Sequence, residues 1–261
     1  MKLKFYQIDA FTDNVFKGNY AGVIILEKFL NIDIMQNIAA ENNLSETAFI
    51  VKNEDESFSI RWFSPLNEID FCGHATLASA FVLFENNEGL EKIKFTADAV
   101  GELFVSKEDK YIKMQFPNQK PEVCETPKEL KSSLSIKPKE ILKNRQAYFA
   151  VYENEEDVLN IKIDLEEIKK LYPLDVVITS SSKKYDFVSR YFWPANGGDE
   201  DPVTGSIHTG LAPYWAQKLN KNELVAKQVS KRGGDLICKV NDNSVTLLGK
   251  AVKYLEGEIY I

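Results

Sequence analysis

Residues 71–84 read FCGHATLASAFVLF: a short turn with Cys72, Gly73 and His74 leads directly into a run of small and apolar residues. The length and apolar character of the run predict a helix that is mostly buried. The first turn of a helix leaves N–H groups without intrahelical partners and carries a partial positive charge. A turn of small residues at that point therefore favours a site where an anion approaches the backbone closely.

A second stretch, residues 197–215, repeats this arrangement with the sequence GGDEDPVTGSIHTGLAPYW. Each stretch follows an Arg-aromatic-Phe-x-Pro segment, RWFSP at 61–65 and RYFWP at 190–194. Cys72 and Asp201 each lie eleven residues after the arginine of their own segment. Because order and spacing both match, the sequence predicts an internal duplication. Each half would wrap a curved sheet around a buried helix, and the two helix N-termini would face one cleft.

Short strands outnumber helices along the chain, which favours an α+β fold over alternating β–α–β units. Helical spacing predicts helices at 31–39, with Asp33 as a cap candidate, at 165–171 and at 204–219, in addition to 71–84. A Pro- and Lys-rich interval at 117–139 separates the halves. We therefore expect a first domain at 1–117 and a second at 118–248. The runs that predict strands are 3–9, 21–26, 47–52, 57–63, 93–96, 101–106, 111–116, 147–151, 176–180, 187–192, 226–230, 236–240, 244–249 and 251–254.

The chain has 261 residues, of which 44% are hydrophobic, and a formal net charge of −7. This composition is typical of a globular protein, and the acidity disfavours nucleic acid or a membrane surface as a partner. Three cysteines without paired spacing and only two histidines argue against a disulfide framework and against a zinc site. The N-terminus lacks a signal-peptide core, and no apolar run reaches the roughly 20 residues of a membrane span. We therefore expect a cytoplasmic protein.

Five motifs resemble those of the PhzF family of phenazine biosynthesis-like proteins, and the likeness runs from about residue 5 to the C-terminus. The resemblance implies a diaminopimelate-epimerase-like fold: two pseudosymmetric domains, each a curved sheet wrapped around a central helix, with the active site in the cleft between them. It also implies that residues 249–261 return to the first domain and that the protein is a homodimer. The motifs are QIDAFT (7–12), KGNYAGV (17–23), NLSETAFI (43–50), FCGHATLASA (71–80) and EDPVTGSIHTGLAPYW (200–215).

The activity that the resemblance implies is a cofactor-independent isomerisation of a small, carboxylate-bearing metabolite by proton transfer. Glu46, in the NLSET motif, would be the general acid/base. His74, Asp201 and Ser206 would position the substrate or relay protons. Neither a metal ion nor a cofactor is expected. The residues that would bind the substrate at the anion site are Asn19, Ser45, Gly73 and Gly205.

Each candidate residue also has an ordinary structural role open to it. Glu46 could be a solvated turn residue, and His74 could bond the backbone at the start of its own helix. Asp201 could cap a helix that begins at Pro202. Ser206 could be a helix-start serine, and His208 is expected to pack on its helix. The sequence does not identify the substrate.

Two other functions stay open. Fold relatives that racemise amino acids use two cysteines, one at each helix start. Here Cys72 occupies one of these positions, but Asp201 occupies the other, which disfavours a two-thiol racemase. A Cys72-dependent epimerase is one alternative, and a non-catalytic metabolite-binding protein on the same scaffold is the other.

Overall fold

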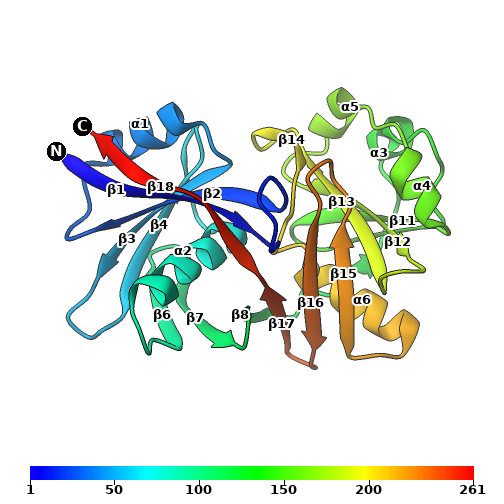
Figure 1. The fold of residues 1–261 in the computed structure, drawn as a ribbon. Helices are drawn as coiled ribbons and strands as arrows, with labels where there is room; N and C mark the ends of the chain where they lie inside the picture. Colours follow the sequence, from blue (N-terminus) through cyan, green and yellow to red (C-terminus); the bar gives the residue numbers. More distant parts are fainter. The chain divides into compact units, whose positions relative to one another are not determined.

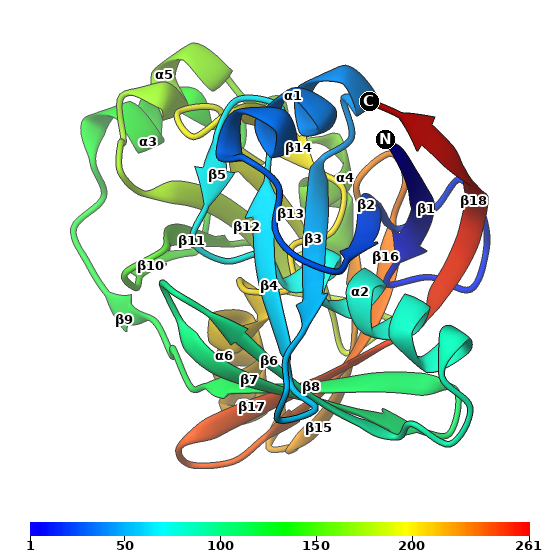
Figure 2. The same ribbon diagram turned by 90° about the vertical axis from the view of Figure 1, so that its left-hand side faces the viewer.

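The computed structural model describes residues 1–261, and the chain divides into two compact units (Figures 1 and 2). Unit 1 comprises Met1–Gln115 together with Leu248–Ile261. Unit 2 comprises Phe116–Leu247. Both ends of the chain belong to unit 1, because the first and last strands pair along their length.

Unit 1 is built on a sheet that combines antiparallel and parallel neighbours. The pairs β2–β3 and β4–β6 are parallel, and the other neighbours are antiparallel. In Figure 1 the blue strand β1 lies beside the red strand β18. A short strand, β5 (Glu68–Ile69), pairs with β4. The strand order is β18 (Ala251–Tyr260), β1 (Lys2–Ala10), β2 (Asn19–Leu26), β3 (Glu46–Lys52), β4 (Phe58–Phe63), β6 (Lys92–Ala97), β7 (Gly101–Glu108) and β8 (Tyr111–Pro117).

Unit 2 repeats this pattern. The pairs β11–β12 and β13–β15 are parallel, and the other neighbours are antiparallel. The short strand β14 (Gly198–Asp201) pairs with β13, as β5 does with β4. The two sheets therefore match in strand order and direction, and the expected pseudosymmetric α+β fold is confirmed. The order is β9 (Glu122–Val123), β10 (Glu140–Lys143), β11 (Ala147–Val151), β12 (Asp175–Ser181), β13 (Phe187–Trp193), β15 (Glu223–Gln228) and β16 (Gly234–Val240); β17 (Ser244–Gly249) then leads into β18.

The arginine of the repeated segment makes the same ion pair in both units. Arg61 of β4 donates to both carboxylate oxygens of Glu68 in β5, at 2.6 and 2.7 Å. Arg190 of β13 donates to both oxygens of Glu200 in β14, at 2.7 and 3.0 Å. Such two-point pairing fixes the plane and direction of both groups. Each arginine thus fastens the short strand that leads to the turn before the central helix.

Helix α2 (Gly73–Asn86) is the central helix of unit 1 (Figure 1). Residues 73–80 are all buried, and the helix contacts β1, β2, β3, β7 and β18. Since these strands come from both ends of the sheet, the sheet curves around the helix. A helix in this position must be small or apolar on nearly every side, and residues 75–84 are apolar except for the buried hydroxyl residues Thr76 and Ser79.

Helix α6 (His208–Leu219) has the corresponding place in unit 2, where it contacts β15 and β16. Trp215 also reaches β12, because its indole N–H donates to Thr179 at 2.9 Å. A Cβ atom on Gly210 would lie 2.7 Å from the ring of Phe149 in β11. A glycine is therefore required where the helix crosses this strand.

A second layer of helices covers the other face of each sheet. In unit 1, α1 (Ile32–Asn42) packs Met35 and Ile38 against Phe5 and Phe49 of the sheet. In unit 2 the apolar cluster of this layer includes Leu130, Val158 and Ile168. These come from three short helices, α3 (Lys128–Ser133), α4 (Glu155–Asn160) and α5 (Leu165–Lys169). None of the helices in the chain combines the length and hydropathy that a membrane crossing requires.

Two expectations about helix starts are wrong: the cap residue of α1 and the first residue of α6. The residue that caps α1 is Asn31, whose side chain accepts a hydrogen bond from the backbone of Asp33. Helix α6 begins at His208 and not near Thr204, because the preceding residues form tight turns with bonds between residues three apart. Asp201 therefore caps no helix; it is the last residue of β14.

Candidate active site

Glu46 is a buried carboxylate at the very start of a strand. It is the first residue of β3, pairs with Ala21 of the parallel strand β2, and is only 6% exposed. The alternative of a solvated turn residue is therefore wrong. A buried carboxylate requires a partner, because removing the charge from water is costly.

The partner of Glu46 is His74, the second residue of α2. Its Nε2 lies 2.8 Å from Oε2 of Glu46, and both side chains are buried. The two atoms are close but not aligned as an N–H···O bond, and Oε2 accepts no other hydrogen bond. Oε2 of Glu46 is therefore buried beside a positive partner but accepts no hydrogen bond, so it is free to accept a proton from a ligand.

Two further candidates, Ser45 and Asn19, hold the other side of the imidazole. Ser45 Oγ donates to Asn19 Oδ1 at 3.0 Å, and Asn19 Nδ2 lies 3.1 Å from His74 Nδ1. With the Asn19 amide in this assigned orientation, Nδ1 accepts and the ring carries its proton on Nε2, facing Glu46. Turning the amide over would offer Oδ1 to a charged ring instead. The network therefore provides a partner for either protonation state of His74.

Charge and burial act against each other at His74. Burial by itself lowers the pKa of the ring, but the neighbouring Cys72 and Glu46 groups outweigh it and hold the pKa of His74 well above its ordinary value. At neutral pH the attraction comes from Glu46, because the pKa of the Cys72 thiol is raised to about 11 by burial and by the same carboxylate. Glu46 and His74 thus form a close, buried charge pair.

Cys72 completes a buried trio with this pair. Its Sγ lies 3.4 Å from Nδ1 and 3.9 Å from Nε2 of His74. The donor atoms of Glu46, Cys72 and His74 lie within 4.8 Å of one another, and these are ligand types that zinc accepts. However, the trio sits at the positive end of α2, and the thiol would have to lose its proton. The expectation that the protein needs no metal stays a prediction.

The start of α2 adds an anion-binding element beside this cluster. Gly73 is the first helical residue, and Cys72 occupies the N-cap position without a side-chain cap bond. The backbone N–H groups of the first turn are therefore not capped by this side chain. Negative charge that develops next to them would be stabilised.

The three remaining candidates lie in unit 2. Asp201 accepts from the Thr204 hydroxyl, and its backbone carbonyl accepts from Gln228 Nε2 at 2.7 Å. Gly205 and Ser206 lie in the turns before α6, where Ser206 Oγ accepts from Gln146 Nε2 at 2.9 Å. The structure thus joins Asn19, Ser45, Glu46, Gly73 and His74 in one cluster of unit 1. The assignment of Asp201, Gly205 and Ser206 to the substrate stays a prediction.

Sequence reasoning missed the two glutamines that organise the unit 2 turn. Gln228 ends β15 and accepts from the Thr204 backbone at 2.9 Å, while Gln146 precedes β11. No motif marks either residue. His208, in contrast, packs as expected: it is fully buried, its Nδ1 meets the Thr204 carbonyl at 2.8 Å, and burial lowers its pKa to about 4.

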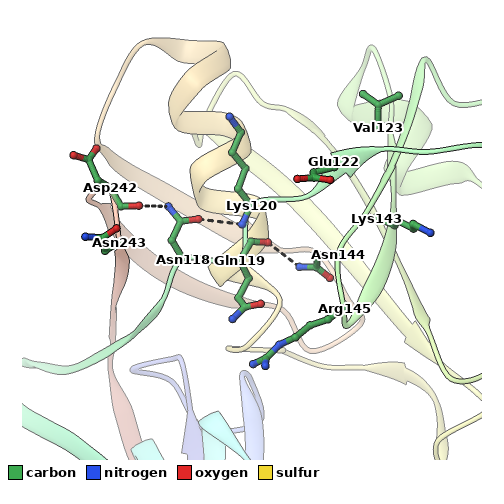
Figure 3. Close-up of a pocket in the computed structure, with 10 residues that line it drawn as sticks. All are labelled: Asn118, Gln119, Lys120, Glu122, Val123, Lys143, Asn144, Arg145, Asp242 and Asn243. Atoms are coloured by element: carbon green, nitrogen blue, oxygen red, sulfur yellow. Dashed lines mark hydrogen bonds between the residues drawn. The ribbon is translucent and has the colours of Figure 1, made fainter.

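A separate hollow of about 680 Å³ lies in unit 2 and contains none of the candidate residues (Figure 3). Much of its polar lining is used internally, since Asn144 donates to the Gln119 carbonyl at 2.9 Å. Figure 3 shows Lys120 and Lys143 pointing apart, so they do not converge on one ligand. The lining residues are Asn118, Gln119, Lys120, Glu122, Val123, Lys143, Asn144, Arg145, Asp242 and Asn243.

Comparisons with known proteins agree on one family. A family model described as "PhzC-PhzF: Phenazine biosynthesis-like protein" matches residues 8–257. An uncharacterized isomerase of Pseudomonas aeruginosa is 43% identical over 100% of both chains, and a human phenazine biosynthesis-like domain-containing protein is 34% identical over 99% of each.

Solved structures show the same relationship. The crystal structure of a PhzF family protein from Enterococcus faecalis has a TM-score of 0.96 and 45% identity, and the match covers 100% of both chains. A hydroxyproline epimerase from Agrobacterium vitis has a TM-score of 0.59 at 9% identity, over 99% of this chain and 92% of the epimerase. The second likeness concerns the fold alone.

Proposed function

The chain belongs to the PhzC-PhzF family of phenazine biosynthesis-like proteins, and we propose that it is an isomerase that moves a proton on a small, carboxylate-bearing metabolite. The observation that carries this proposal is the buried Glu46–His74 pair at the start of α2, where Cys72 makes no side-chain cap bond. Relatives named as isomerases support the reaction class. The pair suggests that the chain's own residues move the proton, without a cofactor.

In the proposed reaction, the Glu46 carboxylate removes a proton from a substrate carbon. The electron pair of the broken C–H bond moves into the conjugated system that ends on the substrate carboxylate. The first-turn N–H groups of α2 and the His74 ring stabilise the resulting enolate-like anion. Glu46, now the neutral acid, returns the proton to a second carbon of the conjugated system, so the product differs from the substrate in the position of one hydrogen and of one double bond.

The remaining candidates have supporting roles in this proposal. Ser45 and Asn19 hold the His74 ring in place through their hydrogen bonds. Ser206, Asp201 and Gly205 are assigned to substrate binding on the strength of the family motif. In this assignment Ser206 donates to the substrate carboxylate.

Deuterium incorporation tests the proposal even while the substrate is unidentified. The pure protein is incubated in heavy water with a small-metabolite extract, and mass spectrometry detects compounds that gain one deuteron. Labelling by the wild type that disappears in Glu46→Gln is the expected result. A ligand bound without any labelled product would favour the non-catalytic alternative.

A thiol-based mechanism is disfavoured by the state of Cys72. Its pKa of about 11 keeps it protonated at neutral pH, whereas a thiol that acts as a base must be a thiolate. We therefore expect Cys72→Ser to label the same compound at a rate within a few-fold of the wild type. Loss of labelling in this variant, with Glu46→Gln unaffected, would assign the proton transfer to the thiol.

We also propose that the protein is a homodimer, as the family resemblance implies. Light scattering on a gel-filtration peak is expected to give about twice the chain mass of 29.7 kDa. A mass equal to one chain across micromolar concentrations would contradict this.

A further inference from the structure

Unit 2 contains a carboxylate at the position that Glu46 occupies in unit 1. Glu46 opens β3 and pairs with Ala21 of the parallel strand β2. Asp175 opens β12 and pairs with Ala147 of the parallel strand β11. The matching strand order of the two sheets makes these two acids counterparts. Asp175 nevertheless contacts no histidine, and its role must differ from that of Glu46.

Asp175 starts a chain of hydrogen bonds that ends on Ser206. The Tyr191 hydroxyl donates to Asp175 Oδ2 at 2.5 Å. Gln146 Nε2 donates one hydrogen to the Tyr191 oxygen at 3.0 Å and its other hydrogen to Ser206 Oγ at 2.9 Å. Asn196 holds the second oxygen of Asp175 at 2.8 Å. All of these residues belong to unit 2.

In this series of hydrogen bonds, the donor and acceptor of each bond follow from those of the bond before it. An ionised carboxylate only accepts, so Tyr191 must donate to Asp175 and accept from its other neighbour. Burial, with the Asp175 charge beside it, holds the pKa of Tyr191 well above its ordinary value, so the hydroxyl keeps its hydrogen. Gln146 must then turn its NH₂ group toward Tyr191, and the same group also reaches Ser206.

Gln146 is itself anchored at the backbone. Its N–H donates to Asn144 Oδ1 at 2.8 Å, and its carbonyl accepts from the Asp175 N–H at 3.1 Å. The side chain therefore starts from a fixed point. Ser206 Oγ, which accepts from Gln146, donates its own hydrogen to no group in the chain.

We propose that Gln146 is a positioning residue for Ser206, held in direction by Tyr191 and Asp175, so that the Ser206 hydroxyl points its hydrogen at the carboxylate of the substrate. This inference rests on the proposed function, in which Ser206 contacts that carboxylate. Gln146 itself is not expected to touch the substrate. Its effect should therefore vanish once the Ser206 hydroxyl is removed.

A double-mutant cycle on binding of 4-fluorobenzoate tests the proposal, with fluorobenzene as the probe that lacks the carboxylate. Fluorine NMR gives the Kd for the wild type, Ser206→Ala, Gln146→Met and the double variant. Loss of a hydrogen bond to a charged group should weaken 4-fluorobenzoate binding about tenfold in Ser206→Ala. Gln146→Met should weaken it less, and the double variant should match Ser206→Ala.

A matched control is available in the same unit. Gln119 makes hydrogen bonds through its backbone only, and Gln119→Met should leave binding unchanged. Thermal unfolding of every variant separates loss of contact from loss of fold. Neither Ser206→Ala nor Gln146→Met should change the affinity for fluorobenzene, which has no carboxylate.

Additive losses in the double variant would overturn the proposal, because Gln146 would then act independently of Ser206. Equal affinity of wild type and Ser206→Ala, or no carboxylate-dependent binding by the wild type, would also overturn it. The proposed isomerase activity is tested separately, by the dependence of deuterium incorporation on Glu46. The two proposals can therefore fail independently: the binding cycle tests the positioning role of Gln146, and deuterium incorporation tests the isomerase activity.

Discussion

Deuterium incorporation is expected to fall about 10²- to 10⁴-fold when Glu46 is replaced by Gln, the range that one positioned general acid or base contributes. An amide has almost the size of the carboxylate but neither removes a proton nor returns one. Because Glu46 is only 6% exposed, water has little access to take over its role. Labelled product per mole of protein and per minute, read by mass spectrometry, is the measured quantity.

The matched control is Glu54→Gln, the same chemical change at an exposed residue just after β3. It should label at the wild-type rate. A folded Glu46→Gln protein that also labels at the wild-type rate would show that another group moves the proton.

The same substitution has a second readout that needs no substrate. The chain has only two histidines, so each can be followed by NMR during a pH titration. The Glu46 carboxylate helps to hold the pKa of His74 above its ordinary value against the effect of burial. Removing the carboxylate charge should therefore lower the pKa of His74. An unchanged pKa would mean that the pair is not electrostatically coupled.

Local sequence patterns predicted the parts of this structure that depend on neighbouring residues. The apolar run at 71–84 predicted α2, which spans Gly73–Asn86, because burial on all sides requires a continuous apolar sequence. The repeated Arg-aromatic-Phe-x-Pro segment predicted an internal duplication. In both units its arginine makes the same two-point ion pair with a glutamate. Among the candidates, Glu46 and His74 were indicated by the resemblance of the NLSET and FCGH motifs to the PhzF family and not by local pattern, and the fold brings them to 2.8 Å of each other.

Features that depend on partners far away in the sequence could not be predicted. Gln146 meets Ser206, 60 residues later, only because of where β11 and the α6 turn lie. Asp175 lies as far after Glu46 as Arg190 lies after Arg61, so the repeat contained this correspondence; the partner of Asp175, the hydroxyl of Tyr191 and not a histidine, was not predicted. The start of α6 was placed too early because the small residues of 204–206 suit both a helix start and the tight turns that form there.

The largest expected effect on stability concerns His208 at acid pH. Burial lowers the pKa of His208 to about 4 in the folded protein, while in the unfolded chain it returns to its ordinary value of 6.5. Between these two pH values His208 is protonated in the unfolded chain but neutral in the folded protein. The free energy of unfolding therefore falls as the pH is lowered. By linkage this one residue should cost about 3 kcal/mol of unfolding free energy between pH 7 and pH 4.

His74 contributes with the opposite sign. Its pKa is raised on folding, so the stability it provides is present below the ordinary histidine pKa and is lost as the pH rises through the folded value. A pH–stability curve of the wild type alone would mix both contributions with those of the carboxylates. The informative quantity is therefore a difference between two proteins that share every other group.

The comparison is between the wild type and His208→Gln, each unfolded by urea at several pH values from 7 to 4. The variant loses packing against Phe187, whose ring centroid lies 5.9 Å from that of His208, so it should be less stable at pH 7. That deficit should shrink steadily toward pH 4, because only the wild type loses the linkage contribution of His208. Parallel curves would mean that His208 takes up its proton equally well in the folded and unfolded protein. In that case the ring would not be held neutral by burial in the core of unit 2.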